Sequence, residues 1–135
     1  GHEDHVADVI SIAKRTGAKC IAAFEIYEWL GKQGIENLLP VNHGGAWDLD
    51  FGKVKFVNAV HSSVLPDGTY GGTPGGYVVE TSEGNFYYAG DTALTLDMKL
   101  IPVTCKPLDF SFMPIGDCFT MGIDDAVIAC DFVNS

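Results

Sequence analysis

The sequence predicts a mixed α/β (α+β) fold, and three observations carry this prediction. Segment 53–60 alternates apolar and polar side chains with a period of two, which is typical of a strand with one buried face. Segments 77–81 and 86–89 are strand-like and flank the turn sequence of residues 82–85, as in a hairpin. Helical spacing appears near the start of the chain, in the apolar residues Val6, Val9, Ile10 and Ala13.

The first elements alternate between helix and strand. Residues 5–17 are expected to form an amphipathic helix that Gly17 ends in a left-handed conformation. A short buried strand at 19–24 and a second helix at 25–32, closed by Gly34, follow. This alternation favours layers of helices packed on a sheet.

Residues 35–60 are expected to be β-structure. We predict strands at 35–41 and 53–60, a turn at Gly44-Gly45, and a hairpin link at 50–53. This part of the chain is therefore a β-meander and not a βαβ unit.

A glycine-rich loop spans residues 61–76. Two prolines, Leu65 and Tyr70 make it too structured for a flexible linker, and long ordered loops are more often functional than idle. It is not a phosphate-binding loop, because it lacks the G-K-[ST] ending and no helix follows it.

The last third of the chain is expected to contain a weak helix at 92–100 and a strand at 109–115. A final helix should run from about residue 122 to the end, with Thr120 as its cap. Asp124 and Asp125 would then lie in its first turn, where acidic side chains are favourable. No internal repeat or boundary divides the chain, so we expect one domain over residues 1–135.

Composition limits the classes of function. With 18 acidic and 8 basic residues the formal net charge is −10, which repels phosphate backbones, so nucleic acid is not expected as a partner. No apolar stretch approaches the ~18 residues needed to cross a bilayer, so no membrane span is expected. The four cysteines form no C-x-x-C pair, which favours buried free thiols and a reducing, cytoplasmic compartment.

Five side chains are candidates for a metal site. His2, Asp4 and His5 place two imidazoles and a carboxylate within four positions, a ligand set that suits Zn²⁺ or a similar ion. A solvated terminus is the alternative interpretation. His61 and Asp91 each lie where a predicted strand stops; alone, the first is more often a structural histidine and the second an Asx-turn residue. Because side chains at strand ends can converge on one site, all five form a possible constellation.

A family resemblance follows from these residues. The opening Gly1-His-Glu-Asp-His5 resembles the last five residues of H-x-H-x-D-H, the signature of the metallo-β-lactamase superfamily, and His61 and Asp91 match its downstream ligands. Further segments resemble a family of metal-dependent hydrolases similar to ascorbate-6-phosphate lactonase, namely His61-Ser-Ser, Tyr70-Gly-Gly-Thr-Pro-Gly-Gly76, Met113-Pro-Ile-Gly116 and Phe119-Thr-Met-Gly122.

The resemblance implies part of a four-layer αββα sandwich. The leading histidine of the motif, the N-terminal strands, the closing C-terminal elements and the last ligand histidine would lie outside these residues. His2 and His61 would hold one metal, Asp4 and His5 a second, and Asp91 would bridge them. The metals are expected to be two Zn²⁺, with Mn²⁺, Fe²⁺ or Ni²⁺ as alternatives.

The implied activity is hydrolysis of a small ester, lactone or phosphodiester by a metal-bound hydroxide. Asp4 is the candidate catalytic residue, chiefly as a metal ligand. The alternatives are a non-catalytic metal-binding or interaction fragment of this fold and, less favoured by the acidic charge, a nuclease of the same superfamily. A small-molecule substrate is expected as the partner, and the oligomeric state is open.

Overall fold

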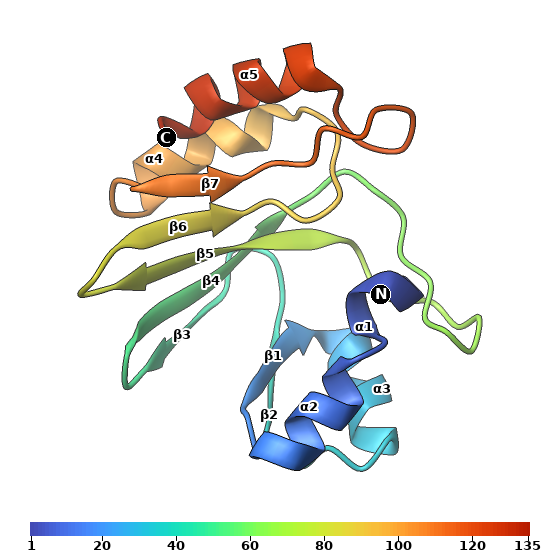
Figure 1. Ribbon diagram of the computed structural model, residues 1–135. Helices are drawn as coiled ribbons and strands as arrows, with labels where there is room; N and C mark the ends of the chain where they lie inside the picture. The colour runs from blue at the N-terminus through green and yellow to red at the C-terminus, as the bar shows by residue number, and fades with distance from the viewer. The chain divides into compact units, whose positions relative to one another are not determined.

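The computed structural model describes all 135 residues, and they form two compact units. The first unit contains Gly1–Asn42 and Ser62–Pro74, and the second contains His43–His61 and Gly75–Ser135. In chain order (Figure 1) the elements are α1 (Glu3–Val6), α2 (Val9–Thr16), β1 (Cys20–Ala23), α3 (Phe24–Lys32), β2 (Leu38–Val41), β3 (Ala46–Leu49), β4 (Gly52–Asn58), β5 (Gly75–Thr81), β6 (Asn85–Tyr88), the 3₁₀ helix η1 (Leu96–Leu100), α4 (Ile101–Thr104), β7 (Phe110–Phe112) and α5 (Ile123–Val133).

The first unit packs helices against a small parallel sheet. Strands β1 and β2 pair in parallel, and Leu30 of α3 is buried in a core that also contains Ala13 of α2 and Leu65 of the glycine-rich loop. The predicted helix at 5–17 is two helices, α1 and α2, separated by a turn at Ala7 and Asp8. The predicted end is confirmed, since Gly17 has φ of +68° and its N–H donates to the Ala13 carbonyl.

The second unit is built on a five-stranded sheet with the order β3-β4-β5-β6-β7. Its first four strands form an antiparallel meander, with the β3–β4 link at residues 50 and 51. The prediction of a meander over 35–60 was wrong for its first strand, because β2 pairs in parallel with β1 across α3 and so completes a βαβ unit. Strand β7 is parallel to β6 and shorter than the predicted 109–115. Pro114 has no N–H to donate, so the ladder cannot continue through it. Strands β4, β6 and β7 therefore run in the same direction, and their carboxyl ends lie at one edge of this sheet.

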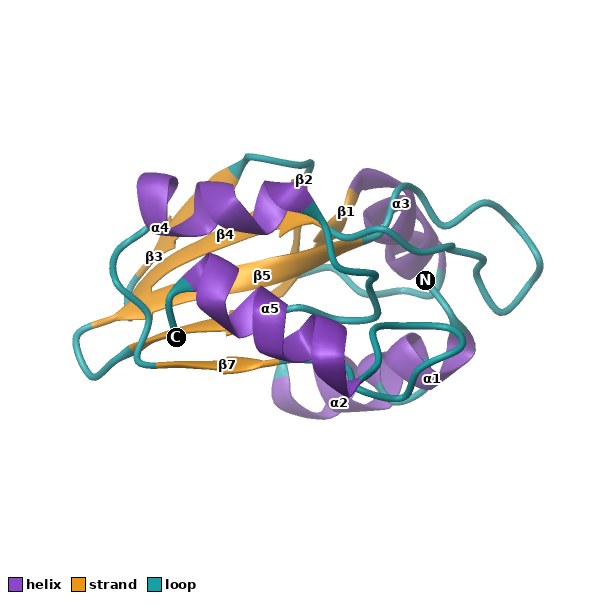
Figure 2. Ribbon diagram, turned by 90° about the horizontal axis from the view of Figure 1, so that it is seen from above, coloured by secondary structure: helices purple, strands orange, loops and turns teal.

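Two helices cover one face of this sheet (Figure 2). Tyr87 of β6 and Val78 of β5 are fully buried with residues of η1, α4 and α5. The opposite face of β6 and β7 carries a ladder of aromatic rings in mutual contact, formed by Phe86, Tyr88, Phe110 and Phe112.

One helix prediction in this unit was wrong at its start and another was wrong in its cap. The predicted helix at 92–100 begins only at Leu96 and continues through α4, because Thr95 caps it by accepting from the Asp97 N–H. Thr120 does not cap the last helix, which begins after Gly122; the Thr120 hydroxyl instead donates to the Met121 carbonyl at 3.4 Å. Asp124 and Asp125 do lie in the first turn of α5, as predicted.

The cysteines and the helix lengths bear on two further expectations, namely buried free thiols and no membrane span. All four cysteines are free thiols; Cys118 is exposed and the others are half-buried, so burial is only partial. Desolvation raises the pKa of the Cys20 thiol. None of the helices combines the length and the apolar character that a bilayer crossing requires.

Candidate metal centre

The start of the chain places three predicted ligands around the first turn of α1. His2 directly precedes the helix, and the His5 N–H donates to the His2 carbonyl at 2.9 Å. The His5 Nε2 atom lies 3.8 Å from the Asp4 Oδ2 atom. The Asp4 side chain is 78% exposed and that of His5 is 35% exposed, so both are open to solvent and to a ligand.

The glycine-rich loop holds this turn in place within the first unit. The Ser62 hydroxyl lies 3.4 Å from His2 Nε2, which leaves Nδ1 as the ring atom not engaged by the serine. Ser63 packs against Gly1 and Gly71, and a Cβ at Gly71 would lie 2.3 Å from the Ser63 Oγ atom. A glycine is required there because any side chain would displace the serine.

The second unit places the other two predicted ligands together. His61 follows β4 and Asp91 follows β6, both at the same edge of the sheet. The His61 Nε2 atom lies 3.7 Å from the Asp91 Oδ2 atom, with side chains 14% and 33% exposed. Two residues that are 30 positions apart thus point their ligand atoms toward each other.

Both pairs have the spacing of ligands on a shared ion. Nitrogen or oxygen atoms about 2.1 Å from a tetrahedral Zn²⁺ lie about 3.4 Å from each other. The distances of 3.7 and 3.8 Å are near this value and longer than a direct hydrogen bond. The mixed imidazole and carboxylate donors also suit Zn²⁺, Mn²⁺, Fe²⁺ or Ni²⁺, so the residues fit the implied group.

Thr92 is a site residue that the sequence analysis missed. It is fully buried, directly after Asp91, and its hydroxyl accepts a hydrogen bond from the Val60 N–H, directly before His61. Its position in the G-D-T turn was the available signal, but nothing local showed that its hydroxyl bonds to a second strand end. The structure thus brings together Asp4 with His5, and His61 with Asp91; the assembly of all five ligands in one centre stays a prediction.

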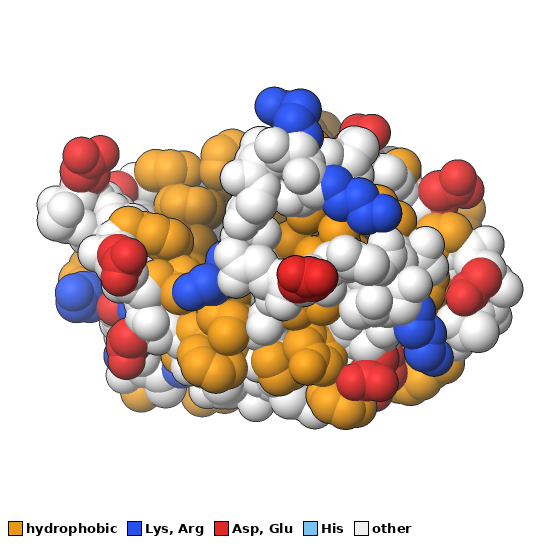
Figure 3. Space-filling view, turned by 90° about the horizontal axis from the view of Figure 1, so that it is seen from below, with side chains coloured by type: hydrophobic (Ala, Val, Ile, Leu, Met, Phe, Trp, Pro, Cys, Tyr) orange, Lys and Arg blue, Asp and Glu red, His pale blue; other side chains and the backbone are white.

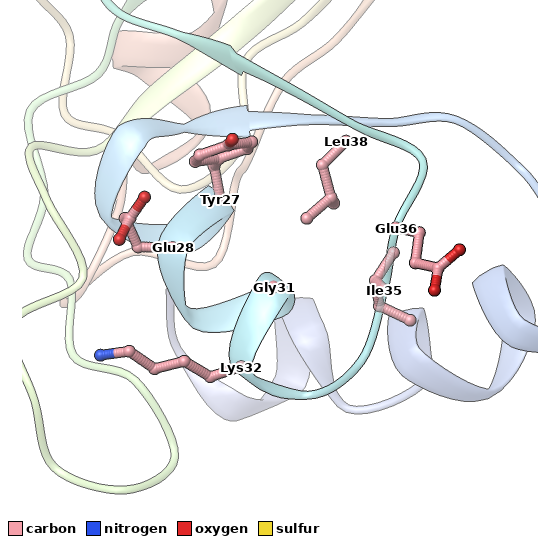
Figure 4. Close-up of a pocket in the computed structure, with 7 residues that line it drawn as sticks. All are labelled: Tyr27, Glu28, Gly31, Lys32, Ile35, Glu36 and Leu38. Atoms are coloured by element: carbon pink, nitrogen blue, oxygen red, sulfur yellow. The ribbon is translucent and has the colours of Figure 1, made fainter.

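A pocket in the first unit is formed by residues other than the predicted metal ligands. It opens between α3 and β2 and is lined by Tyr27, Glu28, Gly31, Lys32, Ile35, Glu36 and Leu38 (Figure 4). None of the predicted metal ligands lines it. Lys32 is its single basic side chain, beside two glutamates.

Basic side chains are scattered on one face of the molecule. On the face drawn in Figure 3, lysine and arginine side chains lie singly among acidic and apolar ones and form no basic stripe. Such a stripe is the footprint expected for phosphate-backbone binding.

Comparison with known proteins agrees with the fold. The family model described as "Beta-lactamase superfamily domain" matches residues 1–134. A protein of Christiangramia forsetii named UPF0173 metal-dependent hydrolase is 58% identical over 133 residues, covering 98% of this chain and 58% of the relative. One of the same name from Methylacidiphilum infernorum is 54% identical, covering 99% of this chain and 59% of the relative.

The solved structure of Igni18, described as a novel metallo hydrolase from Ignicoccus hospitalis, superposes with a TM-score of 0.84 at 33% identity. That match covers 98% of this chain and 56% of the other. The chain therefore spans less than two thirds of the length of these proteins. The predicted α/β fold of the metallo-β-lactamase type is confirmed, whereas the likeness to ascorbate-6-phosphate lactonase is not addressed by these matches.

Proposed function

The chain belongs to the beta-lactamase superfamily, and from this membership we propose that the intact protein is a metal-dependent hydrolase of small molecules. The observation that carries the proposal is the His61–Asp91 pair. Its two ligand atoms lie 3.7 Å apart at the carboxyl ends of two strands. A site at strand ends is where side chains from distant sequence can converge on a substrate.

We assign two metal positions to the five ligands. His2 and His61 would hold the first metal, Asp4 and His5 would hold the second, and Asp91 would be a ligand to both. The covalent chain supports the first assignment: Ser62 follows His61 directly, and the His2 ring lies 3.4 Å from the Ser62 hydroxyl. Ser62 is thus joined covalently to one of the two histidines and contacts the other.

The chemistry of the centre follows from its ligands. Two bound divalent cations, preferably Zn²⁺, would lower the pKa of a water molecule and polarise the scissile carbonyl or phosphoryl oxygen. The imidazoles and carboxylates of this chain would orient the cations and compensate their charge. The Asp4 carboxylate, 78% exposed, is the ligand most accessible to a reacting proton, which makes it the candidate catalytic residue.

The substrate class is a small ester, lactone or phosphodiester. The net charge of −10 argues against a nuclease, because a polyanionic substrate would be repelled. Four free thiols, among them the exposed Cys118, are consistent with a reducing, cytoplasmic compartment. A non-catalytic metal-binding role is the second candidate, and the following experiment separates it from hydrolysis.

The test compares His61→Ala with His43→Gln in the intact protein. His43 lies outside the ligand set, and its ring packs 4.7 Å from that of Phe56. We expect His61→Ala to lower metal content and to abolish hydrolysis of a panel of p-nitrophenyl esters, lactones and bis-p-nitrophenyl phosphate, while His43→Gln retains both. Metal retained by wild type without turnover of any of these substrates would support the binding role. Unchanged metal content and activity in His61→Ala would refute the proposal.

A further inference from the structure

Thr92 is the one polar residue among the buried side chains of this chain, with an exposure of 0%. A buried hydroxyl is costly unless it is hydrogen-bonded, so its bonds indicate why it is there. It lies between Asp91 and Ala93, in the segment after β6.

Two hydrogen bonds join this segment to the end of β4, and a third lies within the segment. The Val60 N–H donates to the Thr92 Oγ1 atom at 3.0 Å, and the Thr92 hydroxyl donates to the Ala93 carbonyl at 2.8 Å. The Ala93 N–H in turn donates to the Val60 carbonyl at 3.0 Å. Both polar backbone groups of Val60 are therefore engaged, and Val60 is covalently next to His61.

A fourth hydrogen bond connects Thr92 to the loop between β7 and α5. The Met121 N–H donates to the Thr92 carbonyl at 3.1 Å, and the Asp117 N–H donates to the Met121 carbonyl at 3.0 Å. The loop between β7 and α5 is thus attached to the same residue. Within the second unit, Thr92 is the point at which the segments following β4, β6 and β7 meet.

We propose that Thr92 is a positioning residue that sets the spacing between the ligand atoms of His61 and Asp91; this rests on the proposed metal-dependent function. Val60, the residue before His61, donates to the hydroxyl of Thr92, the residue after Asp91, so a protein hydrogen bond links the two ligand residues whose atoms lie 3.7 Å apart. Outer residues that orient metal ligands in this way typically change metal affinity by about 10- to 100-fold when they are replaced.

Thr92→Val tests this role, because valine keeps the shape of threonine and removes only the hydroxyl. Thr81→Val is the matched control. The Thr81 hydroxyl also accepts from backbone N–H groups and donates to a carbonyl, but it lies in the β5–β6 turn at the opposite end of the same sheet. Thr92→Ser restores the hydroxyl and is the rescue variant. The intact metal-free proteins are measured for thermal stability and, by competition with a chromogenic chelator, for Zn²⁺ affinity.

We expect Thr92→Val to lose about 10- to 100-fold in Zn²⁺ affinity, while Thr81→Val and Thr92→Ser stay within about twofold of wild type. Both valine variants should lower the melting temperature of the metal-free protein. Equal Zn²⁺ affinity of Thr92→Val and wild type would overturn the proposal and leave only a structural role. If Thr92→Val does not fold, the Zn²⁺ affinity of Thr92→Ser becomes the test. A tenfold loss of Zn²⁺ affinity in this variant, which keeps the hydroxyl, would contradict the positioning role. A wild-type protein that binds no Zn²⁺, Mn²⁺, Fe²⁺ or Ni²⁺ would instead refute the proposed function itself.

Discussion

Replacement of Tyr87 by phenylalanine probes the core beneath α4 and α5. The Tyr87 side chain is 0% exposed, and its hydroxyl is buried with no hydrogen-bond partner. An unpaired buried polar group costs about 1–3 kcal/mol, while phenylalanine keeps the ring and its apolar contacts. Removing the unpaired hydroxyl should therefore stabilise the protein, although the loss of the packing contacts of its oxygen atom offsets part of this stabilisation. We therefore expect Tyr87→Phe to raise the free energy of unfolding at pH 7 by about 1 kcal/mol.

Alkaline pH should enlarge this difference. Burial raises the pKa of Tyr87 to about 12, whereas an unfolded tyrosine titrates near pKa 10. A raised folded pKa contributes stability that is fully present below the unfolded pKa and is lost as pH rises through the folded pKa. The loss between pH 10 and 12 is about 1.4 kcal/mol per pH unit. Tyr87→Phe removes this loss, although Tyr77, whose pKa burial also raises to about 12, keeps its own.

The assay is urea denaturation of the intact protein at pH 7, 10 and 11 for wild type, Tyr87→Phe and the neighbouring Tyr88→Phe. Tyr88 is 46% exposed, so its replacement should change the free energy of unfolding little at any pH. The reasoning is refuted if Tyr87→Phe destabilises the protein at pH 7 by more than about 1 kcal/mol, or if it loses stability with pH as steeply as wild type.

Two further substitutions test the packing of each unit. In the second unit, Gly76→Ala would place a Cβ 2.5 Å from the Tyr88 carbonyl oxygen, so we expect a loss of about 1–3 kcal/mol in the free energy of unfolding. Gly116→Ala, whose Cβ would meet nothing closer than 3.7 Å, is the tolerated control, and equal losses in both would contradict the argument. In the first unit, Leu30→Ala removes a side chain that is 2% exposed, with an expected loss of about 2–5 kcal/mol in urea denaturation. Phe24 is 51% exposed, so Phe24→Ala is the control. If Leu30→Ala lowered the free energy of unfolding no more than Phe24→Ala does, the inference that Leu30 stabilises this core would be wrong.

Local patterns predicted most of the elements and all of the candidate ligands. The period of two at 53–60 predicted β4, and turn residues between apolar runs predicted the β5–β6 hairpin. Gly17 ends α2 as expected because a left-handed residue at a helix end requires little more than the glycine itself. The candidate ligands were found through the spacing of the H-x-D-H residues and through the resemblance that followed, since imidazoles and carboxylates in that order are unusual.

Boundaries that depend on distant partners were less well predicted. The strand at 109–115 is short because its only pairing, with β6, ends at Phe112. The helix after Asp91 starts late because Thr92 bonds to Val60 and Thr95 bonds to its own helix start. The Thr95 cap is local, but the β6–β7 pairing and the Thr92–Val60 bond have no local signature, because each depends on which strands become neighbours in the sheet.

By itself, the sequence determined the fold class and the net charge of −10, and it predicted the candidate ligands. Composition and residue spacing carry this information without any knowledge of contacts. Only the tertiary structure decided that the ligand atoms of His61 and Asp91 lie 3.7 Å apart and that one buried hydroxyl, that of Thr92, connects their strand ends. The physical reason is that a hydrogen bond acts over about 3 Å in space, whereas Val60 and Thr92 are 32 residues apart along the chain.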